Sequence, residues 1–311
     1  MILFEEGVKP SFGGHEKFAF RNGWLKKGVD AVVENGEIFT SDEALVTLGV
    51  GKNMVRSIRH WCLATGLLIE AEGKGNAKAL KPSPLAEWLM LKDQWDPYLE
   101  DLGSLWLIHW QLISNQKRTL VWSLAFSAFF DDEFSKKQLF NLVSKQLLQN
   151  GVKTTPGMVE REIDCLLRTY TPTSSKSGKA VEESLDCPLA DLDLIRFIPD
   201  ENLYRFNIGS KPSLPGAVFK YALIQYLSNV LKNRKTIAIE EILYQIGSPG
   251  QAFKLDENSL FEYLEEIENQ TEGALKIDET TGLRQIYLNE DIIEQLSQQT
   301  YDILGNYYGN N

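Results

Sequence analysis

The strongest constraint on the fold of this chain is the order of elements expected in residues 38–82. This order is a short helix, a tight turn, a second helix and a hairpin. The stretch "LGVGKNMVRSIRHW" (48–61) supplies the glycine-rich turn and begins an amphipathic helix at Lys52, which we expect to end near Gly66. Two strand-like runs in "LLIEAEGKGNAKALKP" then enclose a Gly-Lys-Gly-Asn turn. This is the element order of a winged helix-turn-helix.

The segment before that turn, "IFTSDEALVTLGV", predicts a short strand and then a helix. Thr40 or Ser41 is expected to cap the helix, and Gly49 to end it.

The same order recurs twice in a weaker form. In the second copy, one helix ends at Gly151, another runs from Pro156 to about Tyr170, and "LDLIRFIPDENLYRFNI" predicts a hairpin after a polar loop. In the third copy, "TIAIEEILYQIG" leads to a turn at Ser248-Pro249-Gly250, the helix "DENSLFEYLEEIENQ" and the hairpin "ALKIDETTGLRQIYL". The five tryptophans between residues 84 and 130 indicate buried helix packing between the first two copies.

We therefore predict a mainly α protein with small β-hairpins, made of serial winged helix-turn-helix-like units joined by helical connectors. The expected parts are a Gly/aromatic N-terminal segment (1–37), the first unit (38–92), a Trp-rich helical connector (93–133), a second unit (134–212) with a mobile loop at 171–185, and a helical connector with an acidic third unit (213–311).

Charge is distributed unevenly along the chain. The net charge is −11, yet residues 1–92 hold 12 basic and 11 acidic side chains, whereas residues 237–311 hold 3 basic and 15 acidic ones. Between Lys52 and Lys92 there are seven basic and three acidic residues. An anionic partner is therefore expected to bind near the N-terminus, and the acidic C-terminal unit to contact a partner protein or another copy of the chain.

The helix expected from Lys52 to Ala64 has two distinct faces. At about 100° per residue, one arc holds apolar side chains such as Ile58 and Trp61, and the other is polar. The polar arc consists of Lys52, Asn53, Arg56, Arg59 and His60. Because Lys and Arg neutralise phosphates, and Arg and Asn pair with base edges in the major groove, this face predicts contact with duplex DNA. A solvated surface helix or a protein-binding winged helix would show the same pattern.

Neighbouring basic residues extend this prediction. Lys74 and Lys78 lie in the expected hairpin, and "FGGHEKFAFRNGWLKKG" adds Arg21, Lys26 and Lys27 if the segment packs beside the first unit. The alternative role for this segment is a structural cap that its aromatic residues anchor.

Motifs for catalysis, nucleotides and metals are not found. A P-loop would need glycine at Val46 and serine or threonine at Asn53, and neither occurs. His15-Glu16 is not part of an H-E-x-x-H, and the three cysteines are too far apart to form a metal site by themselves. We expect a non-enzymatic protein without cofactor or metal. The absence of a long apolar run or a signal-like start predicts a cytoplasmic protein without membrane contact.

Five motifs resemble, in the same order, a bacterial family known as domain of unknown function 4007: "FGGHEKFAFRNGWLKKG", "LGVGKNMVRSIRHW", "KPSLPG", "GSPGQAF" and "TGLRQIYL". The resemblance covers nearly the whole chain. It implies a gene neighbourhood of DNA phosphorothioation and phage defence, and therefore an accessory role in DNA modification or restriction. It supplies no catalytic residues.

The sequence thus predicts an accessory protein that binds duplex DNA, modified or not, through its first unit and works with proteins of a modification or restriction complex. The rival is a protein-interaction scaffold of such a complex without direct DNA contact. A third option is an enzyme that recognises and cuts modified DNA, which no ordered acidic metal signature supports.

Overall fold

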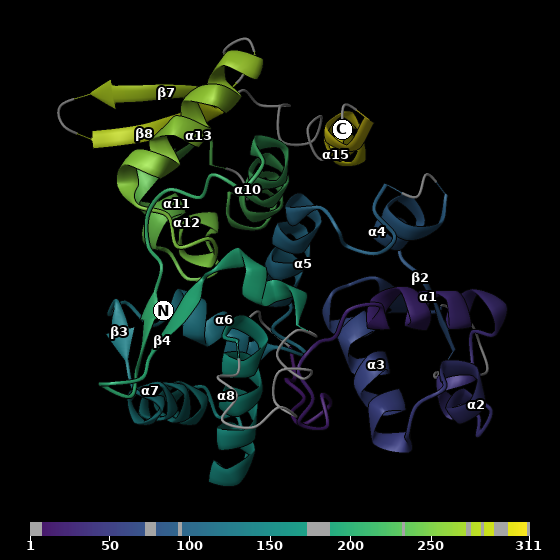
Figure 1. The fold of residues 1–311 in the computed structure, drawn as a ribbon. Coiled ribbons are helices and arrows are strands. Elements are labelled where there is room, and N and C mark those ends of the chain that lie inside the picture. Colours follow the sequence, from purple (N-terminus) through teal and green to yellow (C-terminus); the bar gives the residue numbers. More distant parts are fainter. Residues whose placement is uncertain are drawn as a thin grey trace.

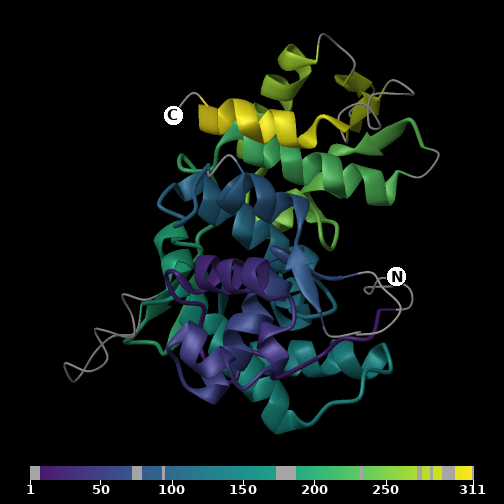
Figure 2. The same cartoon turned by 90° about the vertical axis from the view of Figure 1, so that its right-hand side faces the viewer.

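The computed structural model describes residues 8–71, 79–92, 95–172, 187–231, 234–271, 275–280, 283–288 and 298–309. The described chain is mainly helical and carries three small antiparallel sheets. The first helices lie at one end of the molecule and the C-terminal third at the other, with α5 (Leu102–Ser114) between them (Figures 1 and 2).

The N-terminal unit contains the predicted helix, turn, helix and hairpin. Helix α3 (Lys52–Ala64) follows α2 (Ala44–Leu48), and Gly49 ends α2 in the left-handed conformation with φ of 62°. Strands β1 (Leu68–Glu70) and β2 (Leu80–Pro82) then pair antiparallel. An additional helix, α1 (Trp24–Glu34), packs against both α3 and β2.

Two details of this unit differ from the sequence prediction. The expected strand before α2 is a short 3-10 helix, η1 (Ile38–Thr40). Helix α2 begins only at Ala44, so Thr40 and Ser41 do not cap it, although the Ser41 hydroxyl accepts a hydrogen bond from the Glu43 amide at 3.1 Å. Ile38 is buried, and its carbonyl accepts a hydrogen bond from the Ser41 amide at 3.0 Å, so a local 3-10 turn satisfies this backbone group.

The second unit follows its prediction closely. Helix α7 (Lys136–Gln149) starts with a capping box between Ser135 and Gln138, and α8 (Pro156–Tyr170) starts with Thr155 as N-cap. Strands β4 (Ile195–Ile198) and β5 (Leu203–Phe206) form the hairpin. The sequence did not reveal β3 (Glu133–Phe134), which precedes α7 and pairs with β5. The predicted loop at 171–185 lies largely outside the described residues.

The third unit has the same sheet topology as the second. Strand β6 (Thr236–Ala238) leads into α11 (Ile239–Tyr244), α12 (Pro249–Ala252) and α13 (Glu257–Gln270), and the hairpin of β7 (Leu275–Thr280) and β8 (Leu283–Leu288) follows. The strand orders are β3-β5-β4 and β6-β8-β7. The turn expected at Ser248-Pro249-Gly250 is instead the start of α12, because the Ser248 hydroxyl caps it and proline is tolerated at the first helical position.

Buried connectors join the units. The Trp-rich segment forms the helices α4 (Pro84–Ala86), η2 (Glu87–Leu91), α5 and α6 (Leu120–Ser127). The helices are interrupted near Asp96-Pro97 and at Asn115. Trp106, Trp110 and Trp122 are buried, as the packing interpretation requires. Helix α10 (Gly216–Val230) contacts α15 (Thr300–Gly309). Helix α15 was not predicted from the sequence.

Two family motifs meet inside the molecule. The "KPSLPG" lysine, Lys211, donates from Nζ to the carbonyls of Gly209 at 2.8 Å and Lys254 at 3.2 Å. Lys254 directly follows "GSPGQAF" and is 4% exposed, and its Nζ lies 4.2 Å from the Phe206 ring centroid. Burial lowers the Lys254 pKa to about 7, opposed by Asp132, so these motifs form a polar centre of the core.

Among the described residues, no helix combines the length and apolar character needed to cross a membrane.

Candidate nucleic-acid interface

The first half of α3 exposes a basic edge at the N-terminal end of the molecule. Lys52, Asn53 and Arg56 are exposed and Arg59 is half-buried, whereas Val55, Ile58 and Trp61 are buried against the core. The predicted division of this helix into a polar and an apolar face is therefore present for residues 52–59. Gly51 precedes the helix in extended conformation and provides no side-chain cap.

The only carboxylate paired with this edge among the described residues belongs to Glu16. Its Oε1 lies 3.3 Å from Arg56 Nη1, and the Arg56 side chain is still 56% exposed. An exposed ion pair of this kind is worth about 0.2–1 kcal/mol and does not prevent the arginine from contacting phosphate.

His60 does not lie on the exposed face, which corrects the sequence prediction. Its side chain is only 5% exposed, and burial lowers its pKa to about 3, with further lowering by His15, Arg118 and Arg59. The cause is the N-terminal segment, which packs over this flank of α3: a Cβ on Gly14 would lie 2.3 Å from His60 Nδ1. His60 is therefore neutral at physiological pH and is not available for phosphate contact.

The segment with the "FGGHEKF" motif is clamped between α3 and α8. On the α3 side, the Ser57 hydroxyl donates to the His15 carbonyl at 2.9 Å and Trp61 Nε1 donates to the Phe18 carbonyl at 3.2 Å. On the α8 side, the Gly13 amide donates to Glu162 Oε1 at 2.6 Å. Gly13 has φ of 75°, a conformation that glycine adopts without strain. The segment thus holds the two helices in a fixed relation.

A buried polar group lies beneath this clamp. His15 Nε2 is 3.2 Å from Glu162 Oε1 without hydrogen-bond geometry, and both side chains are almost fully buried. The nearby Trp122 Nε1 and His60 Nε2 are also buried and have no hydrogen-bond partner in the described structure. Unpaired polar atoms in such a cluster are the usual positions of internal water.

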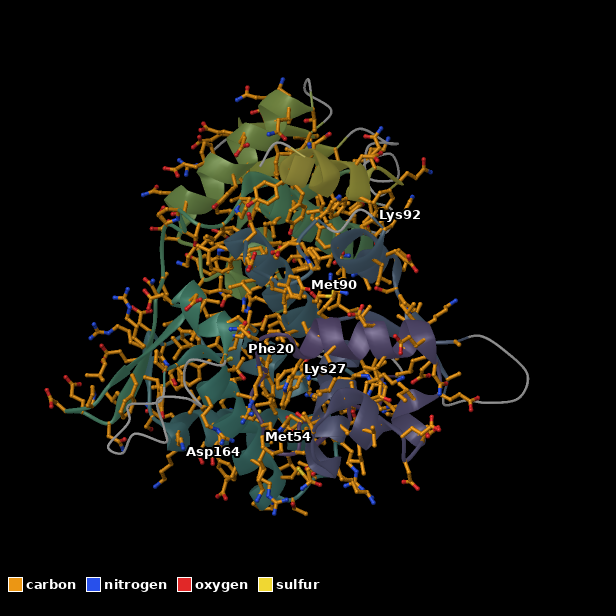
Figure 3. The ribbon with its side chains drawn as sticks, turned by 45° about the vertical axis from the view of Figure 1, so that its right-hand side comes forward. Phe20, Lys27, Met54, Met90, Lys92 and Asp164 are labelled. Carbon is orange, nitrogen blue, oxygen red and sulfur yellow. The ribbon has the colours of Figure 1, made fainter. Side chains whose placement is uncertain are left out.

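The other basic residues predicted for the interface differ in their placement. Lys26 Nζ is engaged by Asp30 at 2.5 Å on the same helix. Lys27 is exposed and donates to the Leu48 carbonyl at 3.1 Å, which places it beside the turn before α3. Arg21 lies over the Phe18 and Trp24 rings. Lys74 and Lys78 lie outside the described residues. Figure 3 shows Lys27 and Met54 on neighbouring elements of this end of the molecule.

Two basic residues that sequence reasoning missed extend the edge. Arg118 lies close enough to Arg59 for their charges to interact, and its guanidinium is 3.5 Å from Glu70 of β1. Lys117 Nζ is 4.0 Å from the same carboxylate. These residues come from the loop after α5, some 60 residues from α3 in sequence, so local spacing could not have placed them there.

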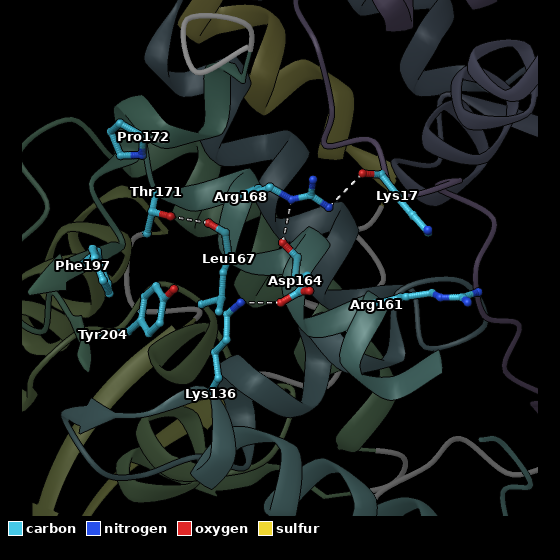
Figure 4. A pocket seen from close by; sticks show the side chains of 10 residues that line it. All are labelled: Lys17, Lys136, Arg161, Asp164, Leu167, Arg168, Thr171, Pro172, Phe197 and Tyr204. Carbon is cyan, nitrogen blue, oxygen red and sulfur yellow. Dashed lines mark hydrogen bonds and ion pairs between the residues drawn. The ribbon is translucent and has the colours of Figure 1, made fainter. Parts of the chain in front are cut away.

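A second group of missed residues lines a pocket of about 500 Å³ beside α8. It brings together four basic side chains (Lys17, Lys136, Arg161 and Arg168), the carboxylate of Asp164, and the rings of Phe197 and Tyr204 (Figure 4). The signal in the sequence was the spacing of Arg161, Asp164 and Arg168, which puts all three on one face of a helix.

The described helices of the acidic C-terminal third lie away from the basic edge. Helices α13 and α15 lie at the opposite end of the molecule from α3 and α8 (Figures 1 and 2). Lys52 and Arg56 are accordingly exposed to solvent.

The chain is similar to two solved structures and to one protein family. Two crystal structures of a protein named SspB, one of them magnesium ion-bound, superpose with a TM-score of 0.86 at 31% sequence identity. Each alignment covers 98% of this chain and 90% of that chain. No curated protein matches the chain. The family model described as "Protein of unknown function (DUF4007)" matches residues 12–308, and the chain therefore belongs to the DUF4007 family.

Proposed function

We propose that this protein is a DNA-binding accessory of a bacterial DNA-modification or phage-defence system of the phosphorothioation type. In this proposal the elements from α1 to β2 act as a winged helix-turn-helix that contacts duplex DNA. The observation that carries it is the exposed basic edge of α3, which lies at the end of the molecule opposite the acidic C-terminal third. Similarity to SspB over nearly the whole chain supports the assignment to such a system.

The proposed contacts follow from exposure. Lys52, Asn53 and Arg56 are the side chains of α3 that can enter a groove, and Arg59 with Arg118 can approach a phosphate at its edge. The hairpin β1–β2 would act as the wing, as expected for Lys74 and Lys78. His60 takes no part, because it is buried and neutral.

Charge reversal tests the proposal. The Arg56→Glu/Arg59→Glu variant should bind a labelled duplex about thirtyfold or more weakly by fluorescence anisotropy, because each phosphate or base contact by arginine is worth about 1–3 kcal/mol. The control is Lys276→Glu, a single charge reversal at an exposed lysine on β7 at the other end of the molecule, which should retain affinity. Equal affinity of the double variant and the unaltered protein would refute DNA contact through α3.

We propose a binding role rather than catalysis. Among the described residues, no group of three or more His, Cys, Asp or Glu is arranged to hold a metal ion. The buried group at His15 offers one carboxylate and two imidazoles, whereas Mg²⁺ prefers oxygen ligands and retained water. Nicking of supercoiled plasmid by the pure protein in magnesium or manganese would overturn this part of the proposal.

A second role is proposed for the C-terminal unit, namely contact with a protein of the same complex or with another copy of this chain. Tyr244 and Tyr287 are 54% and 45% exposed there, and exposed tyrosines are enriched in protein interfaces. Light scattering of the pure protein separates the two partners: a dimer that Tyr244→Ser/Tyr287→Ser dissociates indicates self-association. If the protein is a monomer, and proteins of the modification system co-purify with it but not with Tyr244→Ser/Tyr287→Ser, the result indicates a complex with those proteins.

A further inference from the structure

Among the described residues, the pocket beside α8 is lined by more basic than acidic side chains. Lys136 Nζ is paired with Asp164 Oδ1 at 2.6 Å, so the single carboxylate lining the pocket is neutralised. Arg161, Arg168 and Lys17 form no ion pair within the described part of the chain. Within the described part of the chain, these three cationic groups therefore line the pocket without a carboxylate paired to them.

One of these groups is held in place before any ligand binds. Arg168 donates from Nε to the Asp164 carbonyl at 3.0 Å and from Nη2 to the Lys17 carbonyl at 2.9 Å. A guanidinium has five N–H donors, so donors remain for a ligand. The second bond also fixes Lys17, which is exposed and has φ of 68°, at the rim of the pocket. Figure 4 shows these two bonds and the lysine and arginine side chains that line the pocket.

Aromatic rings form the opposite wall. Phe197 and Tyr204 lie on the hairpin β4–β5 with ring centroids 4.9 Å apart, and both are half-buried. Partial burial raises the Tyr204 pKa, so its hydroxyl stays protonated and can donate a hydrogen bond. The fully buried Phe134 stacks on Tyr204, so Tyr204 is supported from the core, and both Phe197 and Tyr204 line the pocket.

We propose that this pocket binds an unpaired nucleotide, with its phosphate at Arg161, Arg168 and Lys17 and its base against Phe197 and Tyr204. Unbalanced cations beside aromatic rings are the arrangement by which proteins hold unstacked nucleotides. A base inside an intact duplex is stacked and cannot reach a concave wall, whereas one at a strand end or gap can. The volume of about 500 Å³ lies in the range of small-ligand pockets.

The pocket and the basic edge of α3 are neighbours along the N-terminal segment. Glu16 contacts Arg56 of α3 and the next residue, Lys17, lines the pocket. A DNA end bound at α3 could thus place an unpaired nucleotide in the pocket. For a duplex with an overhang, this inference rests on the proposed function, because the duplex part is held by α3. For a short single strand it does not, so single-strand binding tests the pocket independently.

The test compares a blunt duplex, the same duplex with a five-nucleotide overhang, a short single strand and a mononucleotide, each by fluorescence anisotropy or competition. The variants are Arg161→Gln, which removes an exposed cation, and Phe197→Leu, which removes the ring but keeps an apolar side chain. Lys145→Gln, an exposed lysine of α7 outside the pocket, is the matched control.

We expect the overhang to increase affinity over the blunt duplex by about tenfold, the size of one base-stacking contact. Arg161→Gln and Phe197→Leu should each abolish this increase and weaken single-strand binding, while the control retains both. Competition by the mononucleotide alone would identify a free nucleotide as the ligand.

Equal affinity for blunt and overhang duplexes, together with single-strand binding that neither pocket variant changes, would overturn the inference. Blunt-duplex binding that depends on Arg56 and Arg59 would then still support the proposed function. A third outcome is possible: Arg56→Glu/Arg59→Glu leaves blunt-duplex affinity unchanged, while the pocket variants still weaken overhang and single-strand binding. This result would support the pocket and refute duplex contact through α3.

Discussion

Helices α3 and α13 occupy corresponding positions in the chain but carry opposite charge. Each is the last helix before a hairpin and contacts the first strand of that hairpin. The exposed face of α3 carries Lys52 and Arg56, whereas that of α13 carries Glu262 and Glu265. The order of elements is therefore not enough to assign DNA contact, and the side chains on the exposed face decide which unit can meet phosphate.

The two helices also differ in what holds them. A chain segment distant from the hairpin clamps α3 to α8 through His15 and Phe18. Helix α13 packs against α10 and β7 of its own unit, and Tyr263 donates to the carbonyls of Lys211 and Leu214. We infer that the "FGGHEKF" segment holds the basic edge of α3 in position, whereas the position of α13 does not depend on this segment.

The largest expected effect comes from breaking this clamp. Gly14→Ala would place a methyl group against the His60 ring, and overpacking of this kind costs about 1–3 kcal/mol. We expect a loss of about 3 kcal/mol in the free energy of unfolding, measured with urea, and weaker duplex binding. Gly157→Ala is the control, because nothing lies within 4 Å of a Cβ there. Equal stability of the two variants would show that the segment does not clamp α3.

A smaller effect is expected from pH. The unfolded chain protonates His60 as the pH falls through about 6.5, but the folded chain does so only near pH 3, so the free energy of unfolding falls as the pH drops between these values. Between pH 7.5 and 5.5 the loss should be about 1 kcal/mol for His60, and similar for His109, whose pKa burial lowers to about 4. Urea titrations at both pH values should show that His60→Gln has lower stability at pH 7.5 but loses less on acidification. A pH dependence unchanged in His60→Gln would mean that this histidine is not buried as a neutral group.

The smallest effect is expected at α13. Glu262→Lys/Glu265→Lys changes the net charge as much as the α3 double variant does, but in the positive direction and far from the proposed interface. We expect duplex affinity at physiological salt to stay within about twofold, since charges beyond a Debye length of about 8 Å are screened. A gain comparable to the loss at α3 would mean that net charge, rather than the α3 edge, controls binding.

Local patterns were sufficient for much of the fold. The spacing of Val55, Ile58 and Trp61 and the glycine at position 49 gave α3 and its turn, and Thr155-Pro156 gave the start of α8. Strands β3 and β6 escaped prediction because each is three residues long at most and is stabilised by pairing with a strand about 50 to 70 residues away.

The site was predictable only in part, for the same reason. Exposure of Lys52 and Arg56 follows from helical periodicity, but burial of His60 depends on Gly14, which approaches from another part of the chain. The α8 pocket combines Lys17, Lys136 and Arg161 from three separate elements, so only the tertiary fold reveals it.

The salt dependence of duplex affinity tests the central claim most directly. If α3 neutralises phosphates, the logarithm of the association constant should fall linearly with the logarithm of salt concentration, with a slope of about 0.9 per phosphate contacted. We predict a steep decrease between 50 and 200 mM salt, roughly 100-fold or more for several contacts, and a slope smaller by about two in Arg56→Glu/Arg59→Glu. An affinity that stays constant over this range would contradict phosphate contact by α3.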